Sequence, residues 1–67
     1  MSVARVTEIS ATSKKSFEDA VVAGIERATE TLEEVQGAWI DGFKVDVKDG
    51  KIDQYRVNMK VTFVLKK

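Results

Sequence analysis

Few side chains of this sequence are reactive enough for catalysis. The chain has no histidine and no cysteine, so it lacks the common general base, the thiol nucleophile and the usual zinc ligands. It also has no Walker-type phosphate loop and no dinucleotide fingerprint. Ser10, Ser13 and Ser16 lie close together, but no base accompanies them, so we interpret them as cap and loop residues. The sequence therefore predicts a protein that is not an enzyme.

Trp39 is the single tryptophan and the first candidate for a ligand contact. Its indole offers a flat π-face and an N–H donor, which suit a contact between subunits or stacking on a small planar ligand. In the second case, the polar edge of the ligand would meet Gln54, Arg56 or Asn58. The residues alone leave both interpretations open.

Two groups of charged residues have several interpretations. Arg56 has three possible roles. It could be a solvated charge, an ion-pair partner of Asp41 or Asp46, or a bidentate hydrogen-bond donor to a ligand carboxylate or phosphate. Asp46, Asp49 and Asp53 surround one turn and could gather a calcium ion, but they lack the regular spacing of a dedicated calcium loop. We therefore assign no metal ligands.

The first elements that must position these residues are a strand and a helix. Val3–Ala11 is rich in β-branched residues, which predicts a strand. We expect Ser13, or alternatively Ser16, as the N-cap of a helix of about five turns that Gly37 ends in a left-handed conformation. Apolar residues spaced by three and four give this helix one apolar stripe, namely Phe17, Val21, Gly24, Ile25, Ala28, Leu32 and Val35.

Residues 38–48 and 51–66 read as two antiparallel strands that flank Asp49-Gly50, a strong hairpin signal. In the second of them, the odd positions from Tyr55 to Leu65 are apolar and alternate with polar residues, so one face is buried. A two-residue turn would place Phe43 beside Arg56. A three-residue loop with Gly50 in the left-handed region keeps the apolar face coherent, and we prefer it.

The preferred register leaves Asp41 pointing into the core, unless a bulge at Asp41-Gly42 inserts one extra residue. We predict this bulge. It turns Ile40 to the core and moves Trp39 to the polar face, near Asn58. Arg56 and Lys60 then lie diagonal to Trp39.

Length and composition favour self-association. Residues 1–67 form a single domain that buries only about 60% of its unfolded surface, and disulfides are excluded. One helix cannot cover a third strand of up to about 50 Å. Eleven basic and eleven acidic residues cancel, so we expect no nucleic-acid partner. Met1 to Ser10 lack the apolar core of a signal peptide and no apolar run spans a membrane, so we expect a cytoplasmic protein without a membrane partner.

The whole chain resembles the dodecin family. The resemblance is carried by the Thr12-Ser13 cap, the helix SFEDAVVAGIERATETLEEV and a DG hairpin that ends in YRVNMKVTFVL. It implies an α+β fold of the order β-α-β-β, with a three-stranded antiparallel sheet wrapped around one helix. It also implies a hollow homododecamer that binds FMN or riboflavin and stores or sequesters the flavin.

The resemblance also assigns site residues. Flavin-binding dodecins stack a tryptophan of the second strand on the isoalloxazine and bond its edge with a glutamine of the third. Counted without gaps, the glutamine position falls on Arg56 and the tryptophan position on Gly37, with Trp39 two residues later. We expect Trp39 as the stacking platform and Arg56 as the polar partner. The alternative is a dodecin-like shell that binds calcium or another small ion instead of flavin, or that is purely structural.

Overall fold

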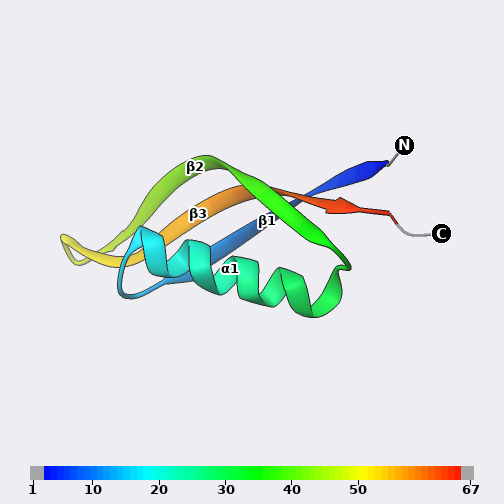
Figure 1. Cartoon of the computed structure of the whole chain (residues 1–67). Coiled ribbons are helices and arrows are strands. Elements are labelled where there is room, and N and C mark those ends of the chain that lie inside the picture. Colours follow the sequence, from blue (N-terminus) through cyan, green and yellow to red (C-terminus); the bar gives the residue numbers. More distant parts are fainter. Residues whose placement is uncertain (1–2, 66–67) are drawn as a thin grey trace.

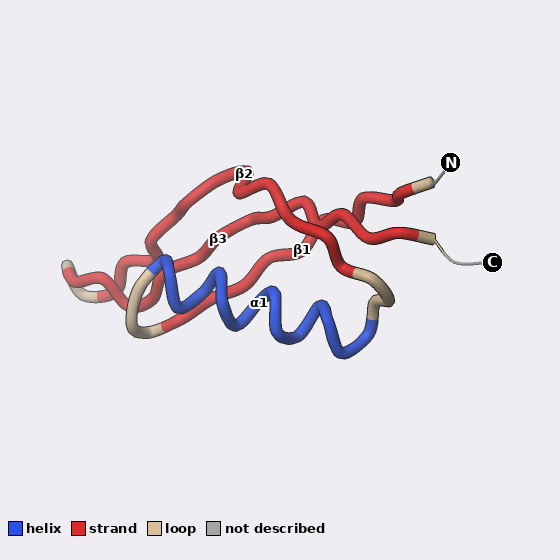
Figure 2. The backbone as a smooth tube through the Cα atoms, viewed as in Figure 1, coloured by secondary structure: helices blue, strands red, loops and turns tan. Residues whose placement is uncertain are grey.

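The computed structural model describes residues 3–65 and has the element order β-α-β-β. β1 spans Ala4–Ser13, α1 spans Phe17–Thr31, β2 spans Val35–Lys48 and β3 spans Lys51–Val64. The strands form one antiparallel sheet in the order β1-β3-β2, which curves around α1 (Figure 1). Short loops join the elements (Figure 2). The predicted fold class, one helix on a three-stranded antiparallel sheet, is confirmed.

Helix α1 begins at the second of the two predicted caps. The hydroxyl of Ser16 accepts a hydrogen bond from the backbone N–H of Asp19 at 3.0 Å, so Ser16 is the N-cap. The choice of Ser13 as the N-cap was wrong, because its hydroxyl is used inside the preceding turn. Ser13 Oγ accepts from the N–H of Lys15 at 2.9 Å and donates to the Asp19 carboxylate at 2.6 Å.

The predicted end of the helix was wrong. Helix α1 stops at Thr31, and Leu32 is already extended, although its N–H still donates to the carbonyl of Ala28 at 2.8 Å. The left-handed residue is Glu34, with a φ of 53°. Gly37 has no positive φ and lies within β2, because the ladder with β3 begins at Val35 and satisfies the backbone there.

The turn of the β2–β3 hairpin also differs from the prediction. Asp49 and Gly50 have φ values of 53° and 76°, and Lys48 pairs directly with Lys51, so the loop has two residues and not three. A bulge then inserts Asp53 into β3, between the rungs that hold its two neighbours. Because of this bulge, the apolar side chains of β2 and β3 lie on the same face of the sheet, as predicted. Phe43 lies opposite Val57 and Val45 lies opposite Tyr55.

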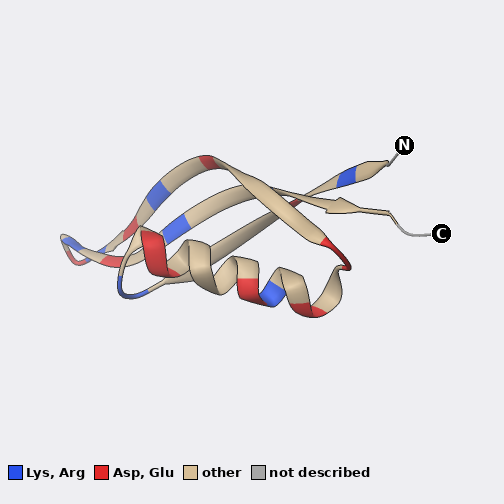
Figure 3. Cartoon of the chain, in the orientation of Figure 1, with Lys and Arg blue, Asp and Glu red and all other residues tan. Residues whose placement is uncertain are grey.

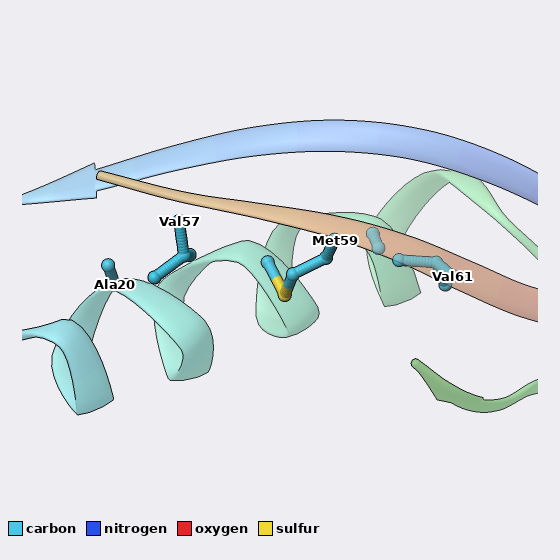
Figure 4. Close-up of a cluster of buried hydrophobic side chains, with 5 residues drawn as sticks. Ala20, Val57, Met59 and Val61 are labelled. Atoms are coloured by element: carbon cyan, nitrogen blue, oxygen red, sulfur yellow. The ribbon is translucent and has the colours of Figure 1, made fainter. Parts of the chain in front are cut away.

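The core lies between α1 and the odd-numbered residues of β3. Val57, Met59 and Val61 are fully buried, and their side chains point toward α1, where Ala20 lies beside Val57 (Figure 4). The rings of Phe43 and Tyr55 pack edge-on against Phe17, with centroids 5.0 and 5.1 Å away respectively, and close the core at the start of the helix. The predicted apolar stripe therefore faces the sheet from Phe17 to Ala28, whereas Leu32 and Val35, which were predicted to continue it, lie outside α1.

One helix leaves much of this sheet without cover. The hairpin extends beyond the start of α1, and the far ends of β1 and β3 extend beyond its other end (Figure 1). The radius of gyration is 13.7 Å, against about 11 Å for a compact domain of this length. The accessible surface is 5050 Å², against about 4200 Å² for a typical compact monomer of this mass. Large apolar side chains are exposed at Val3, Val6, Val22, Trp39, Ile40, Phe43, Val47, Ile52 and Leu65.

Candidate functional site

The predicted site residues lie on the face of the sheet that turns away from α1, which we name the outer face. Side chains alternate across a strand, so the even-numbered residues of β3 from Gln54 onward point away from the helix, and so do their partners across the ladder. By this alternation the outer face carries Gly37, Trp39, Lys44, Asp46, Gln54, Arg56, Asn58 and Lys60.

Trp39 presents its indole to solvent on this face. The residue is 64% exposed, although tryptophan normally buries most of its large apolar surface. The predicted bulge that turns it outward is confirmed, since Ile40 pairs with Met59 and Gly42 pairs with Asn58, with Asp41 as the extra residue.

The partner predicted for Trp39 was wrong. Trp39 lies opposite Lys60 and not beside Asn58, because the bulge shifts the pairing by a single residue. Gly37 lies opposite Thr62 and has open space where a side chain would stand. The outer face around Trp39 is therefore flanked by a lysine on one strand and by a glycine on its own strand.

Arg56 takes the second of its three predicted roles, the ion pair. Its Nη2 donates to Asp46 Oδ2 at 3.3 Å, and its Nη1 donates to Ser10 Oγ at 3.4 Å. Gln54 Nε2 donates to the same Asp46 oxygen at 2.8 Å. Lys44 lies opposite Arg56, with its Nζ 3.8 Å from Asp46 Oδ1. All three strands thus contribute to one polar cluster, which we name the Asp46 cluster.

The electrostatics of the Asp46 cluster favour the ionised carboxylate. The hydrogen bond from Gln54 lowers the pKa of Asp46 below its ordinary value, and the hydrogen bond and charge of Arg56 act in the same direction. Two cations thus face one carboxylate. Basic and acidic residues both occur along β2, β3 and α1, and neither sign covers a whole element (Figure 3).

The structure does not bring Trp39 and Arg56 together within one copy. The partner of Trp39, Lys60, lies four residues from Arg56 along β3, which corresponds to about 13 Å. Asn58 lies between them, opposite Gly42 on one side and Ser10 on the other. A planar ring stacked on Trp39 would therefore meet Asn58 or Lys60 before it met Arg56.

The acidic residues around the hairpin turn do not converge on one point. Asp46 is engaged by Gln54 and Arg56, while Asp53 pairs with Lys14 at 3.1 Å. Within residues 3–65, no group of three or more histidine, cysteine, aspartate or glutamate residues is placed to hold a metal ion.

Two grooves lie on the helix side of the sheet. One, of about 430 Å³, runs between α1 and β1, and the other, of about 460 Å³, runs between α1 and β2. Neither is lined by Trp39 or Arg56. In the described part of the chain the candidate site is thus an open sheet face. No helix in the described part of the chain is long and apolar enough to cross a membrane.

Sequence reasoning named most residues of this polar face, but it did not assign two of them to it. Lys44 was not predicted to take part, and Ser10 was interpreted as a cap or loop residue although it lies within β1. Asp46 was named as one of two partners for Arg56 and as one of three candidate calcium ligands. The pairing of β2 with β3 could have identified Lys44 and Asp46, since it places them opposite Arg56 and Gln54. The contribution of Ser10 depends on the position of β1, which sequence alternation did not fix.

The comparisons with known proteins agree with each other. The family model described as Dodecin matches residues 3–66. The dodecin from Streptomyces davaonensis is 33% identical, with a TM-score of 0.94 over 98% of this chain and 97% of its own. The dodecin from Streptomyces coelicolor is 27% identical, with a TM-score of 0.94 over 98% and 94%.

A crystal structure of a T. thermophilus dodecin mutant has the same fold, with a TM-score of 0.94 over all of both chains at 24% identity. No curated protein matches the sequence.

Proposed function

Because this chain belongs to the dodecin family, we propose that its copies assemble into a hollow homododecamer that binds FMN or riboflavin and stores or sequesters it. The proposal makes it a flavin-binding protein and not an enzyme. The observation that carries it is the indole of Trp39, which is 64% exposed on a sheet face lined with polar side chains. Its cytoplasmic location stays a prediction.

Assembly would cover surface that the single chain leaves exposed to solvent. Exposed apolar side chains at both ends of the sheet and the excess of accessible surface over a compact monomer favour burial against further copies. Water-excluding cover on the outer face must come from outside the chain, since α1 lies on the other face. A flavin ring held between two copies would be shielded on both sides, which strengthens its polar contacts.

The geometry favours separate roles for the polar residues. Asn58 is next to the rung of Trp39 and its amide both donates and accepts hydrogen bonds, so it suits the edge of the isoalloxazine or the hydroxyls of the ribityl chain. Arg56 and Lys44 lie further along, where they suit the terminal phosphate of FMN. Gln54 supports Arg56 through Asp46, and Gly37 leaves room beside Trp39.

Flavin fluorescence tests the proposal. Addition of the protein should quench riboflavin and FMN, because stacking on an indole quenches the isoalloxazine. Replacement Trp39→Leu should weaken Kd by about tenfold or more, since stacking on an aromatic face is worth about 1–3 kcal/mol. Trp39→Phe is the matched control, because it keeps a ring to stack on and should lose less affinity than the leucine variant.

Full flavin fluorescence in the presence of excess wild-type protein would rule the proposal out. A calcium titration by calorimetry would then separate the ion-binding shell from a purely structural one.

A further inference from the structure

Arg56 is not a free cation on the outer face. Its guanidinium is held between the carboxylate of Asp46 at 3.3 Å and the hydroxyl of Ser10 at 3.4 Å. Gln54 donates to the same carboxylate oxygen at 2.8 Å and so fixes its position. An anionic ligand group that approached Arg56 would have to compete with a carboxylate that is already in place.

The charges around this point decide what the competition selects. Asp46 is only 26% exposed at its side chain, so its charge is less screened by solvent than that of Lys44, which is 71% exposed. Asp46 therefore offsets much of the attraction that Arg56 would exert on a phosphate. A neutral ligand loses nothing by this arrangement, because it does not depend on the guanidinium charge.

We propose that Asp46 is the residue that sets the selectivity of the outer face between phosphorylated and neutral ligands. It holds Arg56 along the sheet and reduces the advantage of a phosphate, so that FMN and riboflavin are bound with similar affinity. The proposal rests on the flavin-binding function above in its choice of ligands, and the structure places the carboxylate at the one arginine of the predicted site.

The variant Asp46→Asn tests this directly. The amide has the shape of the carboxylate and still offers an oxygen to Gln54, but it removes the charge that restrains Arg56. The ratio of the Kd for riboflavin to the Kd for FMN should rise by about fivefold or more over wild type. This is the effect expected when a negative charge 3.3 Å from the guanidinium of Arg56 is removed from a site that solvent partly screens. An unchanged ratio would overturn the proposal.

Asp49→Asn is the matched control. It makes the same change of charge in the hairpin turn, where asparagine suits the φ of 53° as well as aspartate does. It should leave the ratio within about twofold of wild type. An equal rise in both variants would show a general effect of net charge and would also overturn the proposal. In the double variant Asp46→Asn with Arg56→Gln, the ratio should return toward the wild-type value, because the released cation is gone.

A measurement without flavin keeps this proposal separate from the proposed function. The chain has only three arginines, so the Nε–H signal of Arg56 can be followed by NMR after arginine labelling. Titration with inorganic phosphate should shift that signal at about fivefold lower concentration in Asp46→Asn than in wild type. If wild-type protein quenches no flavin, the flavin function fails, and this titration still decides the role of Asp46. Equal phosphate affinities in the two proteins would refute it.

Discussion

At the scale of single residues, the oxygens of Asp46 organise the outer face. One carboxylate oxygen accepts hydrogen bonds from Gln54 at 2.8 Å and from Arg56 at 3.3 Å, and Lys44 lies near the other oxygen. These contacts explain why Arg56 lies along the sheet and does not extend into solvent. They also make the stability of the cluster depend on the ionisation of one carboxyl group.

The lowered pKa of Asp46 predicts an acid-sensitive contribution to stability. Since the folded pKa is below the unfolded one, the contribution is present above the ordinary aspartate pKa of about 3.9 and is lost as the pH falls through the folded pKa. We expect the difference in urea midpoint between wild type and Asp46→Asn to stay constant from pH 7 to about pH 5 and to narrow below about pH 4. Unfolding must be followed at one fixed protein concentration.

The hydrogen bond from Gln54, which is the largest cause of the lowered pKa of Asp46, can be tested separately. In a Gln54→Leu background, the difference in urea midpoint that Asp46→Asn causes should narrow less as the pH falls. The reason is that the hydrogen bond that lowers the pKa of Asp46 most is absent there. A midpoint difference that persists unchanged to pH 2 in the wild-type background would contradict the assignment.

At the scale of elements, the distance between α1 and the sheet depends on one glycine. A Cβ at Gly24 would overlap Met59 Cε and lie 3.0 Å from the Cβ of Ala11. Met59 is fully buried beneath the helix, so its end has no solvent to move into. Gly24 therefore allows α1 to approach β1 and β3 together, and any side chain there separates the two layers.

Gly24→Ala should thus destabilise the protein, although alanine is the better helix former by about 1 kcal/mol. We expect a net loss of about 1–3 kcal/mol in the free energy of unfolding, because overpacking strains a filled core. Gly37→Ala serves as the control, since nothing lies within 4 Å of the added carbon and its φ is not positive. That variant should change stability by less than about 0.5 kcal/mol. Chemical denaturation measures both, and a more stable Gly24→Ala protein would refute the packing argument.

At the scale of the whole molecule, the hairpin carries an apolar surface that the chain itself leaves open. Phe43, Val47 and Ile52 are 61%, 64% and 53% exposed and share the helix side of the sheet. Phe43 reaches Phe17 at the start of α1, and the hairpin extends beyond that point (Figure 1). The principal extents of 51, 19 and 13 Å describe an elongated body and not a sphere. Such a shape buries these residues only against another molecule.

A charge within this surface should disrupt the proposed assembly. For Val47→Glu, we expect a smaller species than wild type in sedimentation at micromolar concentration, because a buried unpaired carboxylate opposes the contact. Lys48→Glu is the control, since it places the same side chain one residue later on the opposite face of β2 and should keep the wild-type size. A well-folded monomeric wild-type protein, or an assembly unaffected by Val47→Glu, would contradict the prediction.

The sequence alone determined the parts of this protein that depend on local periodicity. Alternation along β3 identified Val57, Met59 and Val61 as core residues, and the apolar stripe of α1 placed the helix against them. The misfit of Asp41 predicted the bulge that turns Trp39 outward. These inferences hold because the repeats of a helix and a strand fix which face of an element is apolar, whatever lies opposite.

Only the tertiary structure decided the features that depend on the ladder between strands. The sequence analysis was wrong about where α1 ends, which is Thr31, and about the partner of Trp39. It was also wrong about the hairpin turn, which has two residues and a compensating bulge at Asp53. The bridge from Arg56 to Asp46 was left open there. Each is set by where backbone hydrogen bonds between strands begin and by how many extra residues each strand inserts. That count accumulates along the ladder, so a local pattern that predicts one bulge, as at Asp41, does not fix the pairing along the whole strand.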